Sequence, residues 1–551
     1  MRRSYKTFIP ALILLVALSG VAANQYDDVY FLIKKNFTIF SEVYKEVALR
    51  YVDEVDPEKL MRKGISSMLD ALDPYTVLID ESQNQRIDII TKGSYGGVGL
   101  EVGYKRGQVV VIAPVDGYSA QKKGIRAGDI IVSVDGLSLE NLSAEEVQNI
   151  MYGEPGSEVT ITIKRYGLDE PLTYTLERER VEIKNVSFAG LIGPNDEIGY
   201  IILNRFSQNT AEEIRNAIQN FQEKKNPKGL ILDLRNNPGG LLQEAVETVD
   251  KFVKPGTEVV RTKGRLPEHN NVFKTDEPAI FKDKPVIVLQ NQGSASASEV
   301  VAGAFQDLDR AVIVGEQSFG KGLVQIIKPL SYNTALKITT SRYYTPSGRS
   351  IQSLTYTHDK GNSVLVNADS SKKAFKTANG RTVYEGEGII PDIKVESESR
   401  SRLQMALERE SHYFFFANRY ASETDSLIKP DKTELLSEFK IYLEKHGFDY
   451  NSTSEELLEQ LEEEIDKGQM KSDYHSEINE LRELVNKKKK KQFEDQKELI
   501  YRKLFNELLS RFKNSSEKID ASTNSDLYIQ RAIQLIEDST TYQQLLTPTP
   551  N

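Results

Sequence analysis

Three serines stand close together in a turn whose position in the chain suits nucleophilic chemistry. Ser294, Ser296 and Ser298 separate an apolar run from an amphipathic stretch within residues 285–308, a pattern that predicts strand, turn and helix. A hydroxyl at a helix start lies near free backbone N–H groups and the positive end of the helix dipole, which favour an oxyanion. Residues 296–299 also match a capping box, whose ordinary task is to start a helix. Both interpretations fit this stretch.

A lysine between two glycines, Lys321, follows a second apolar strand at residues 311–315. A serine hydroxyl is a poor nucleophile until a base takes its proton, and lysine is such a base only in its neutral form. Its reference pKa of about 10.4 would have to fall to about 7 through burial. The nearby apolar residues that the sequence offers for this burial are Phe319, Leu323 and Val324. Taken alone, a lysine in such a loop would be an ordinary surface residue.

The motifs GSASASE and FGKGLVQ together resemble those of the C-terminal processing peptidases, also called tail-specific proteases. The resemblance extends over residues 35–395 and implies a serine endopeptidase with a Ser/Lys dyad. It makes Ser296 the nucleophile and Lys321 the general base. It also makes Gln325, about one helical turn further on, the residue that holds the lysine amine.

A second glycine-rich turn, DLRNNPGG at residues 233–240, follows a fully apolar strand and opens a helix. Two glycines at such a junction commonly mark only a tight turn, but they also allow a backbone N–H to face a bound carbonyl. By resemblance this motif supplies one oxyanion donor, either Gly239 or Gly240, and the Ala297 N–H supplies the other. The motif also contains Asp233 and Arg235, which we expect to form a salt bridge or to support the turn, with a direct chemical role as the alternative.

Residues 93–167 have short alternating strands separated by glycine-rich turns. The segments YGGVGL and GIRAGD, together with a helix expected over 143–151, resemble a PDZ domain. In such a domain glycines let successive N–H groups approach an anionic chain end, and a strand beside them adds the peptide as a further strand. The resemblance assigns peptide binding to four loop residues, Gly97, Val98, Gly99 and Leu100.

The N-terminus reads as a secretory signal peptide, because basic residues precede an apolar run and a small-residue exit, Val21-Ala22-Ala23. A permanent membrane anchor is the alternative. The apolar run, residues 8–23, contains Pro10 and is shorter than the about 20 residues that a spanning helix needs. We therefore expect cleavage after Ala23 and a periplasmic protein, with membrane contact only if the segment stays uncleaved.

Composition narrows the class of protein. The chain has 551 residues, a net charge of −10 and no cysteine. The charge argues against a nucleic-acid partner, and the absence of cysteine excludes disulfides and thiolate metal sites. We expect a multidomain α/β (α+β) fold with a polar inserted loop or hairpin at 358–387. Its parts are a signal peptide (1–23), an N-terminal helical domain (24–92), a PDZ domain (93–167), a serine protease core (168–395) and a helical C-terminal extension (396–551).

The sequence thus predicts an exported serine endopeptidase that needs no cofactor and no metal. It would bind unstructured C-terminal tails of protein substrates in the PDZ domain and hydrolyse peptide bonds with the dyad, and its helical segments leave oligomers possible. One alternative is a catalytically inactive peptide-binding scaffold, against which the joint presence of Ser296, Lys321 and Gln325 argues. Another is a Ser-His-Asp hydrolase, but no histidine falls in a segment expected beside the turn, and no G-x-S-x-G elbow occurs.

Overall fold

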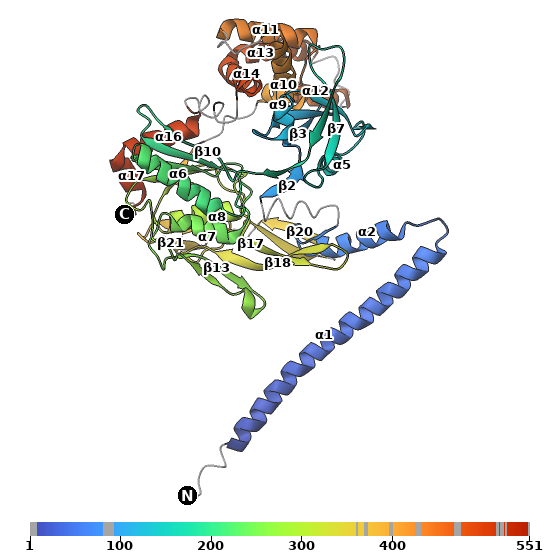
Figure 1. Cartoon of the computed structure of the whole chain (residues 1–551), viewed down its shortest axis with the longest axis vertical. Helices are drawn as coiled ribbons and strands as arrows, with labels where there is room; N and C mark the ends of the chain where they lie inside the picture. The colour runs from blue at the N-terminus through green and yellow to red at the C-terminus, as the bar shows by residue number, and fades with distance from the viewer. Residues whose placement is uncertain are drawn as a thin grey trace.

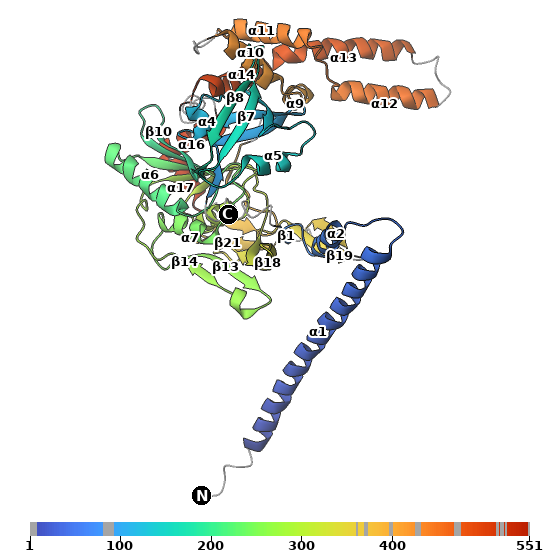
Figure 2. The same cartoon turned by 45° about the vertical axis from the view of Figure 1, so that its right-hand side comes forward.

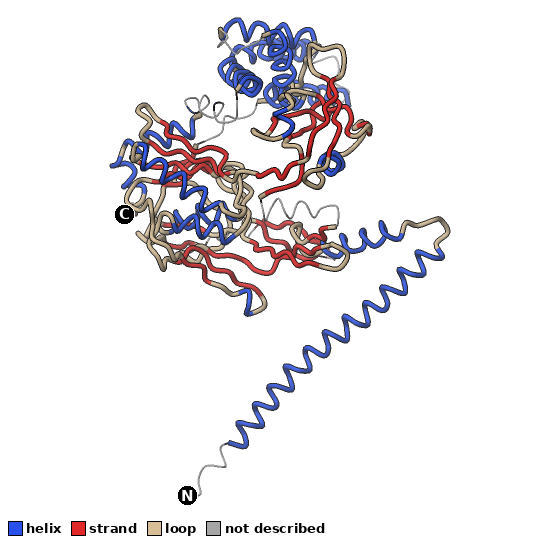
Figure 3. Tube along the Cα trace, viewed as in Figure 1, coloured by secondary structure: helices blue, strands red, loops and turns tan. Residues whose placement is uncertain are grey.

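The computed structural model describes residues 8–80, 93–359, 362–367, 373–395, 401–424, 431–467, 475–513, 517, 523 and 526–548. A long N-terminal helix leads into a protease core, a PDZ domain sits beside the core, and a helical domain lies beyond the PDZ domain (Figure 1). Figure 3 shows how helices and strands are divided among these parts. The predicted multidomain α/β architecture is confirmed.

A six-stranded sheet forms the centre of the protease core. Its order is β10-β11-β12-β15-β16-β23, and every neighbouring pair is parallel except β10 with β11. Every residue of β12, β15 and β16 is buried, as expected for parallel strands with helices on both faces. The strands are β10 (Val186–Ile192), β11 (Ile198–Leu203), β12 (Gly229–Asp233), β15 (Val286–Gln290), β16 (Val312–Gly315) and β23 (Ile393–Lys394).

Helices from distant parts of the chain cover the two faces of this sheet. One face packs on α6 (Thr210–Lys224), α7 (Leu242–Asp250) and α8 (Ala297–Asp307). The opposite face packs on α16 (Leu527–Glu537) and α17 (Ser539–Leu545), drawn in red at the left of Figure 1. The Val286 N–H on β15 donates to the Tyr542 hydroxyl of α17 at 3.1 Å. The predicted C-terminal extension is therefore divided, since residues 526–548 belong to the protease core and residues 401–513 do not.

A second sheet is built around β18 (Ala335–Tyr344). β17 (Leu323–Pro329) pairs along one edge of β18, while β1 (Val77–Ile79) and β13 (Glu258–Gly264) share the other edge. β14 (Val272–Lys274) extends the sheet beyond β13. The expected N-terminal helical domain over 24–92 thus also contains a strand, because residues 77–79 complete this sheet.

The polar insertion contains two hairpins. β19 (Leu354–Asp359) pairs with β20 (Asn362–Asn367), and β21 (Ala374–Lys376) pairs with β22 (Thr382–Tyr384). The first hairpin begins four residues before the expected insertion at 358–387. A hairpin in this stretch was one of the two expected forms.

The PDZ domain has a sheet of order β3-β4-β5-β7-β8, with β6 paired to β5. Its strands are β3 (Leu100–Lys105), β4 (Gln108–Pro114), β5 (Ile130–Val134), β6 (Leu137–Ser138), β7 (Glu158–Lys164) and β8 (Leu172–Glu177). The predicted boundary at 167 falls too early, because β8 pairs with β7 and carries the sheet to Glu177. The domain also contains α4 (Ser119–Lys122) and α5 (Ala144–Met151), and a ribbon of β2 (Ser94–Gly97) and β9 (Glu179–Glu182) leads to the core.

The helical domain docks on the PDZ domain. Its helices are α9 (Arg402–Arg409), α10 (His412–Glu423), α11 (Lys432–Lys445), α12 (Thr453–Lys467), α13 (His475–Asp495) and α14 (Lys497–Phe512). The Asn418 amide donates to the Gly128 carbonyl at 3.0 Å, and Arg106 Nε donates to the Glu410 carbonyl at 2.7 Å. In Figure 2 the outer ends of α12 and α13 project beyond the rest of this domain.

The helix α1 (Phe8–Arg50) extends away from the rest of the molecule and is followed by α2 (Pro57–Asp70) (Figures 1 and 2). From Val29 onward α1 exposes several large apolar side chains, among them Tyr30, Phe31 and Phe37. Where side chains are described, none of the helices is long and apolar enough to span a membrane. Cleavage after Ala23 stays a prediction.

Packing of α16 on the sheet leads to a first prediction. Ile533 is buried against the core strands, so Ile533→Ala should destabilise the protease core by about 2–5 kcal/mol through lost burial and a residual cavity. Leu527 on the same helix is 52% exposed, and Leu527→Ala should change stability by no more than about 0.5 kcal/mol. Hydrogen exchange of the β15 amides measures both effects. Equal protection in the two variants would contradict the role given to α16.

Candidate active site

Ser296 sits in a strained backbone conformation at the start of α8. Its φ of 57° and ψ of −115° lie outside the regions that residues with a side chain normally occupy. Such conformations cost about 1–3 kcal/mol and are found mostly at functional sites. The capping interaction exists as well, because the Glu299 carboxylate accepts the Ser296 N–H at 2.8 Å. The two interpretations of this turn are therefore compatible.

The structure separates the three serines of the turn. The Ser294 hydroxyl donates to the Leu234 carbonyl at 2.8 Å, and the Ser298 hydroxyl donates to the Asn237 carbonyl at 2.9 Å. Both side chains are buried, with exposures of 2% and 0%. These two hydroxyls fasten the turn to the DLRNNPGG loop, whereas Ser296 is only partly buried. Ser296 thus differs from the other two serines in its exposure, and its role as the nucleophile stays a prediction.

A buried carboxylate, Glu299, joins the serine turn to the lysine loop. Its Oε2 accepts the N–H groups of Ser296 and Lys321, both at 2.8 Å. Its Oε1 accepts the Ser318 hydroxyl at 2.5 Å and the Gly320 N–H at 2.7 Å. Burial raises the pKa of Glu299 while these hydrogen bonds oppose the rise. All four partners are donors, which suits the ionised, acceptor-only carboxylate.

The Lys321 amine lies 4.4 Å from the centroid of the Tyr75 ring. Burial is the main reason that its pKa falls to about 8, and the positive charge of Lys337 lowers it further, while Glu299 and Asp73 act in the opposite direction. The expected neighbour Phe319 is 47% exposed, and its part in this burial stays a prediction. Tyr75, an aromatic residue from the N-terminal segment and far away in sequence, contacts the lysine.

Gln325 lies on strand β17, not one helical turn beyond Lys321. Its amide nitrogen donates to the Thr339 hydroxyl at 3.2 Å. The structure has no hydrogen bond between these two described residues, Gln325 and Lys321. Its role in holding the amine therefore stays a prediction.

The two glycines of the DLRNNPGG loop have different surroundings. A side-chain carbon at Gly239 would lie 2.8 Å from both Ser296 Cβ and Ala297 N, and one at Gly240 would lie 2.0 Å from the Phe206 carbonyl oxygen. Gly239 thus faces the serine, although its N–H donates to Asn237 Oδ1 at 2.9 Å. Ala297 is the first residue of α8, where a backbone N–H has no acceptor within the helix. The oxyanion assignment to these three residues stays a prediction.

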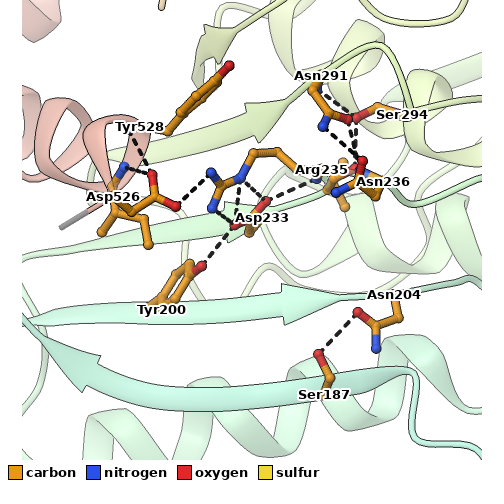
Figure 4. Close-up of polar contacts among 12 residues, drawn as sticks. Ser187, Tyr200, Asn204, Asp233, Arg235, Asn236, Asn291, Ser294, Asp526 and Tyr528 are labelled. Atoms are coloured by element: carbon orange, nitrogen blue, oxygen red, sulfur yellow. Dashed lines mark hydrogen bonds and ion pairs between the residues drawn. The ribbon is translucent and has the colours of Figure 1, made fainter. Parts of the chain in front are cut away.

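The same loop is held by an ionic network that reaches the C-terminal helices (Figure 4). Arg235 pairs with Asp233 at 2.6 Å, as the sequence led us to expect, and also with Asp526 at 2.8 Å. Its guanidinium lies 5.0 Å from the Tyr528 ring, and the Tyr200 hydroxyl donates to Asp233 at 2.8 Å. The sequence analysis missed Asp526, because no local pattern connects it to a loop almost three hundred residues earlier.

The predicted peptide-binding loop joins β2 to β3 in the PDZ domain. Val98 is buried and its carbonyl accepts the Ala120 N–H at 3.0 Å, while Gly99 has a φ of 74° that a glycine tolerates easily. Leu100 begins β3, which lies at the end of the sheet order with β4 as its strand partner. An edge strand of this kind can accept an extended peptide. Gly97 ends β2 beside Tyr95.

In the part of the chain that the structure describes, no metal site is found and no histidine bonds to Ser296. Within the described ranges, no group of His, Asp or Glu residues is arranged to hold a metal ion. His412 and His446 lie in the helical domain, and His269 lies in a turn after β13. None of these three side chains has a hydrogen bond to Ser296.

Comparison with known proteins places these features in a family. Residues 197–360 match the model of peptidase family S41, residues 110–165 match a PDZ domain, and residues 403–536 match a probable PDZ-protease C-terminal helical domain. The chain is 39% identical over 351 residues to a carboxy-terminal-processing protease of Bartonella bacilliformis, covering 63% of this chain and 78% of that one.

Two further matches are a relative and a solved structure. A probable CtpA-like serine protease of Staphylococcus aureus is 32% identical over 425 residues, covering 74% of this chain and 82% of that protein. A solved photosystem II D1 C-terminal processing protease is 28% identical, covering 68% of this chain and 95% of that chain, with a TM-score of 0.36.

A PDZ domain attached to an S41 core defines a serine-type peptidase. The match to the Bartonella protein, at 39% identity over 78% of its length, identifies the family within this class. The chain belongs to the family of C-terminal processing peptidases.

The surroundings of Lys321 lead to a second prediction. The reactivity of its amine should rise with pH through about 8, because only the neutral amine is nucleophilic. Lys337→Met removes a positive charge that lowers this pKa, so the midpoint should move to higher pH. Trace acylation at a series of pH values, read by mass spectrometry, measures the midpoint. As a control, Lys328→Met alters an exposed lysine of β17 and should leave it unchanged. A midpoint near 10.4 in the parent protein would contradict the burial argument.

Proposed function

We propose that this protein is an exported endopeptidase that captures unstructured C-terminal tails of proteins and cleaves them with Ser296 and Lys321. The observation that carries the proposal is the position of Glu299. One carboxylate oxygen binds the backbone N–H groups of both proposed catalytic residues. It therefore brings together two segments that are separated by strand β16 in the sequence.

In the proposed reaction, neutral Lys321 takes the proton of the Ser296 hydroxyl, and the oxygen attacks the carbonyl carbon of the scissile bond. The Ala297 N–H and one glycine N–H of the DLRNNPGG loop would stabilise the negative oxygen of the tetrahedral intermediate. The C–N bond then breaks and the lysine returns its proton to the leaving amine. Water, activated by the same lysine, hydrolyses the acyl-enzyme.

The proposed capture site is the groove between β3 and α5. The Tyr104 hydroxyl on β3 donates to the Leu142 carbonyl at 2.9 Å, close to the residue that caps α5. A peptide added beside β3 would place its terminal carboxylate at the loop of Gly97, Val98, Gly99 and Leu100. Substrates would therefore be proteins with exposed, extended tails.

Export and self-association complete the proposal. The basic residues and apolar run at the N-terminus support delivery to the periplasm by a signal peptide cleaved after Ala23. The apolar side chains that α1 exposes from Val29 onward support contact with a second copy of the chain. Size measurement of the secreted protein with and without residues 24–50 tests this contact.

The nucleophile is tested by comparing the three serines. Ser296→Ala should abolish cleavage of an unfolded reporter, because no other hydroxyl of the turn is free to attack. Ser294→Ala and Ser298→Ala each remove a hydrogen bond to the DLRNNPGG loop, so we expect about 1 kcal/mol of lost stability and a partial loss of rate. Mass spectrometry confirms that the serine is replaced in every molecule. Full activity of this Ser296→Ala protein would refute the assignment.

Tail recognition is tested with one reporter that carries a free, an amidated or an aspartate-terminated tail. A lost charged hydrogen bond is worth roughly 1.5–3 kcal/mol, so amidation should slow cleavage about 10- to 150-fold. Leu100→Asp places a negative charge at the loop and should abolish the difference, whereas Leu137→Asp on the exposed β6 turn should not. Equal rates on all three tails would remove tail recognition while leaving the protease assignment intact.

A further inference from the structure

An interruption in one edge of the second sheet forms a cavity of about 330 Å³. β1 pairs with residues 335–337 of β18, and β13 pairs with residues 341–344 of the same edge. Residues 338–340 therefore have no strand partner on this side. Thr339 and Thr340 line the cavity together with Asp73 and with residues 263–265 at the end of β13, which places it at this edge of the sheet.

The cavity is lined by three basic side chains, Lys263, Arg265 and Arg342. Lys263 and Arg342 are direct partners in the β13–β18 register and both are exposed. Like charges directly opposite each other on neighbouring strands destabilise a sheet. Among the described residues, neither of these two cations forms an ion pair with a carboxylate. An anion bound between Lys263 and Arg342 would reduce the repulsion between these two cations.

One carboxylate, Asp73, lines the same cavity but is already satisfied. Its Oδ1 accepts the N–H groups of Tyr75 and Thr76, both at 2.8 Å, and its Oδ2 accepts the Thr76 hydroxyl at 2.9 Å. Its oxygens are thus bonded within its own loop, and its single negative charge is outnumbered by the three cations that line the cavity.

The cavity adjoins the candidate active site. Asp73 is near enough to Lys321 to raise its pKa, and Tyr75 of the same loop contacts the Lys321 amine. Thr339, which lines the cavity, also accepts the hydrogen bond of Gln325. The cavity and Lys321 therefore share the loop of Asp73 and Tyr75.

We propose that this cavity is a substrate subsite that binds a carboxylate of the polypeptide near the scissile bond, through Arg342, Lys263 and Arg265. The carboxylate is either an acidic side chain or the free end of the tail. The inference rests on the proposed function, and it makes the protease selective for residues beside the bond in addition to the chain end held by the PDZ domain.

Binding is measured with labelled peptides on the intact chain carrying Ser296→Ala, so that no cleavage is needed. The peptides carry Glu, Gln or Lys at successive positions around the expected cleavage site, and each is made with an amidated and with a free chain end. Glu at one position should strengthen binding about 5-fold or more relative to Gln. The preference should shrink when the ionic strength rises from about 0.05 to about 0.5 M, because these cations are exposed.

Arg342→Glu should abolish this preference and favour Lys instead, and the milder Arg342→Gln should reduce it. Lys328→Glu is the matched control, since Lys328 is exposed on the neighbouring strand and pairs with Leu336, about 20 Å along β18 from Arg342. It should keep the preference.

Three results decide the matter. No preference in the parent, or the same preference in Arg342→Glu, would overturn the subsite. A preference for the free over the amidated chain end that Arg342→Glu removes would support the subsite and identify the tail carboxylate as its ligand. Failure of the unsubstituted enzyme to cleave any of these peptides, with the Glu preference intact, would count against the proposed function and not against the subsite.

Discussion

The carboxylate of Glu299 is the interaction on which the rest of the site depends. It accepts four hydrogen bonds inside the protein, from the serine turn on one side and from the loop of Ser318, Gly320 and Lys321 on the other. A fully buried carboxylate is costly unless it is completely satisfied. The four donors therefore keep both segments in place, and they oblige Ser296 to accept a backbone conformation that a serine would otherwise avoid.

The proposed base, Lys321, depends on a different condition, which is partial burial of its amine. The pKa of Lys321 falls mainly because the amine is removed from water, and the ring of Tyr75 contributes to that burial. Tyr75 comes from the N-terminal segment, just before the strand that joins the sheet of β18. Three distant parts of the chain therefore surround the Lys321 amine: the loop of Tyr75, the start of helix α8 with Glu299, and strand β18 with Lys337. The same junction leaves the gap in the sheet edge that forms the basic cavity.

The C-terminal part of the chain contacts both the PDZ domain and the protease core. Residues 401–513 dock on the PDZ domain, and residues 526–548 cover the sheet of the protease core. Asp526 completes the ion pairs of Arg235, whose loop leads directly to Gly239 beside Ser296 (Figure 4). Burial alone would lower the pKa of Arg235, but Asp233 and Asp526 raise it, so the guanidinium stays charged. The network is a fixed support for the turn that faces the serine.

The sequence by itself determined the local elements and the family. Hydrophobic periodicity located α6 and β18 at the bounds observed, since a helix or strand shows its buried face in the order of its own residues. The motifs around Ser296 and Lys321 pointed to the peptidase because their spacing and residue types are specific.

Only the tertiary structure decided which distant groups meet. It set Ser296 apart from Ser294 and Ser298, placed Tyr75 beside Lys321, added β1 to the sheet of β18 and divided the C-terminal helices between two domains. It also showed Gln325 bonded to Thr339. Contacts such as Arg235 with Asp526 leave no local pattern, because ion pairs and burial depend on distances in space, whereas periodicity records only neighbours along the chain.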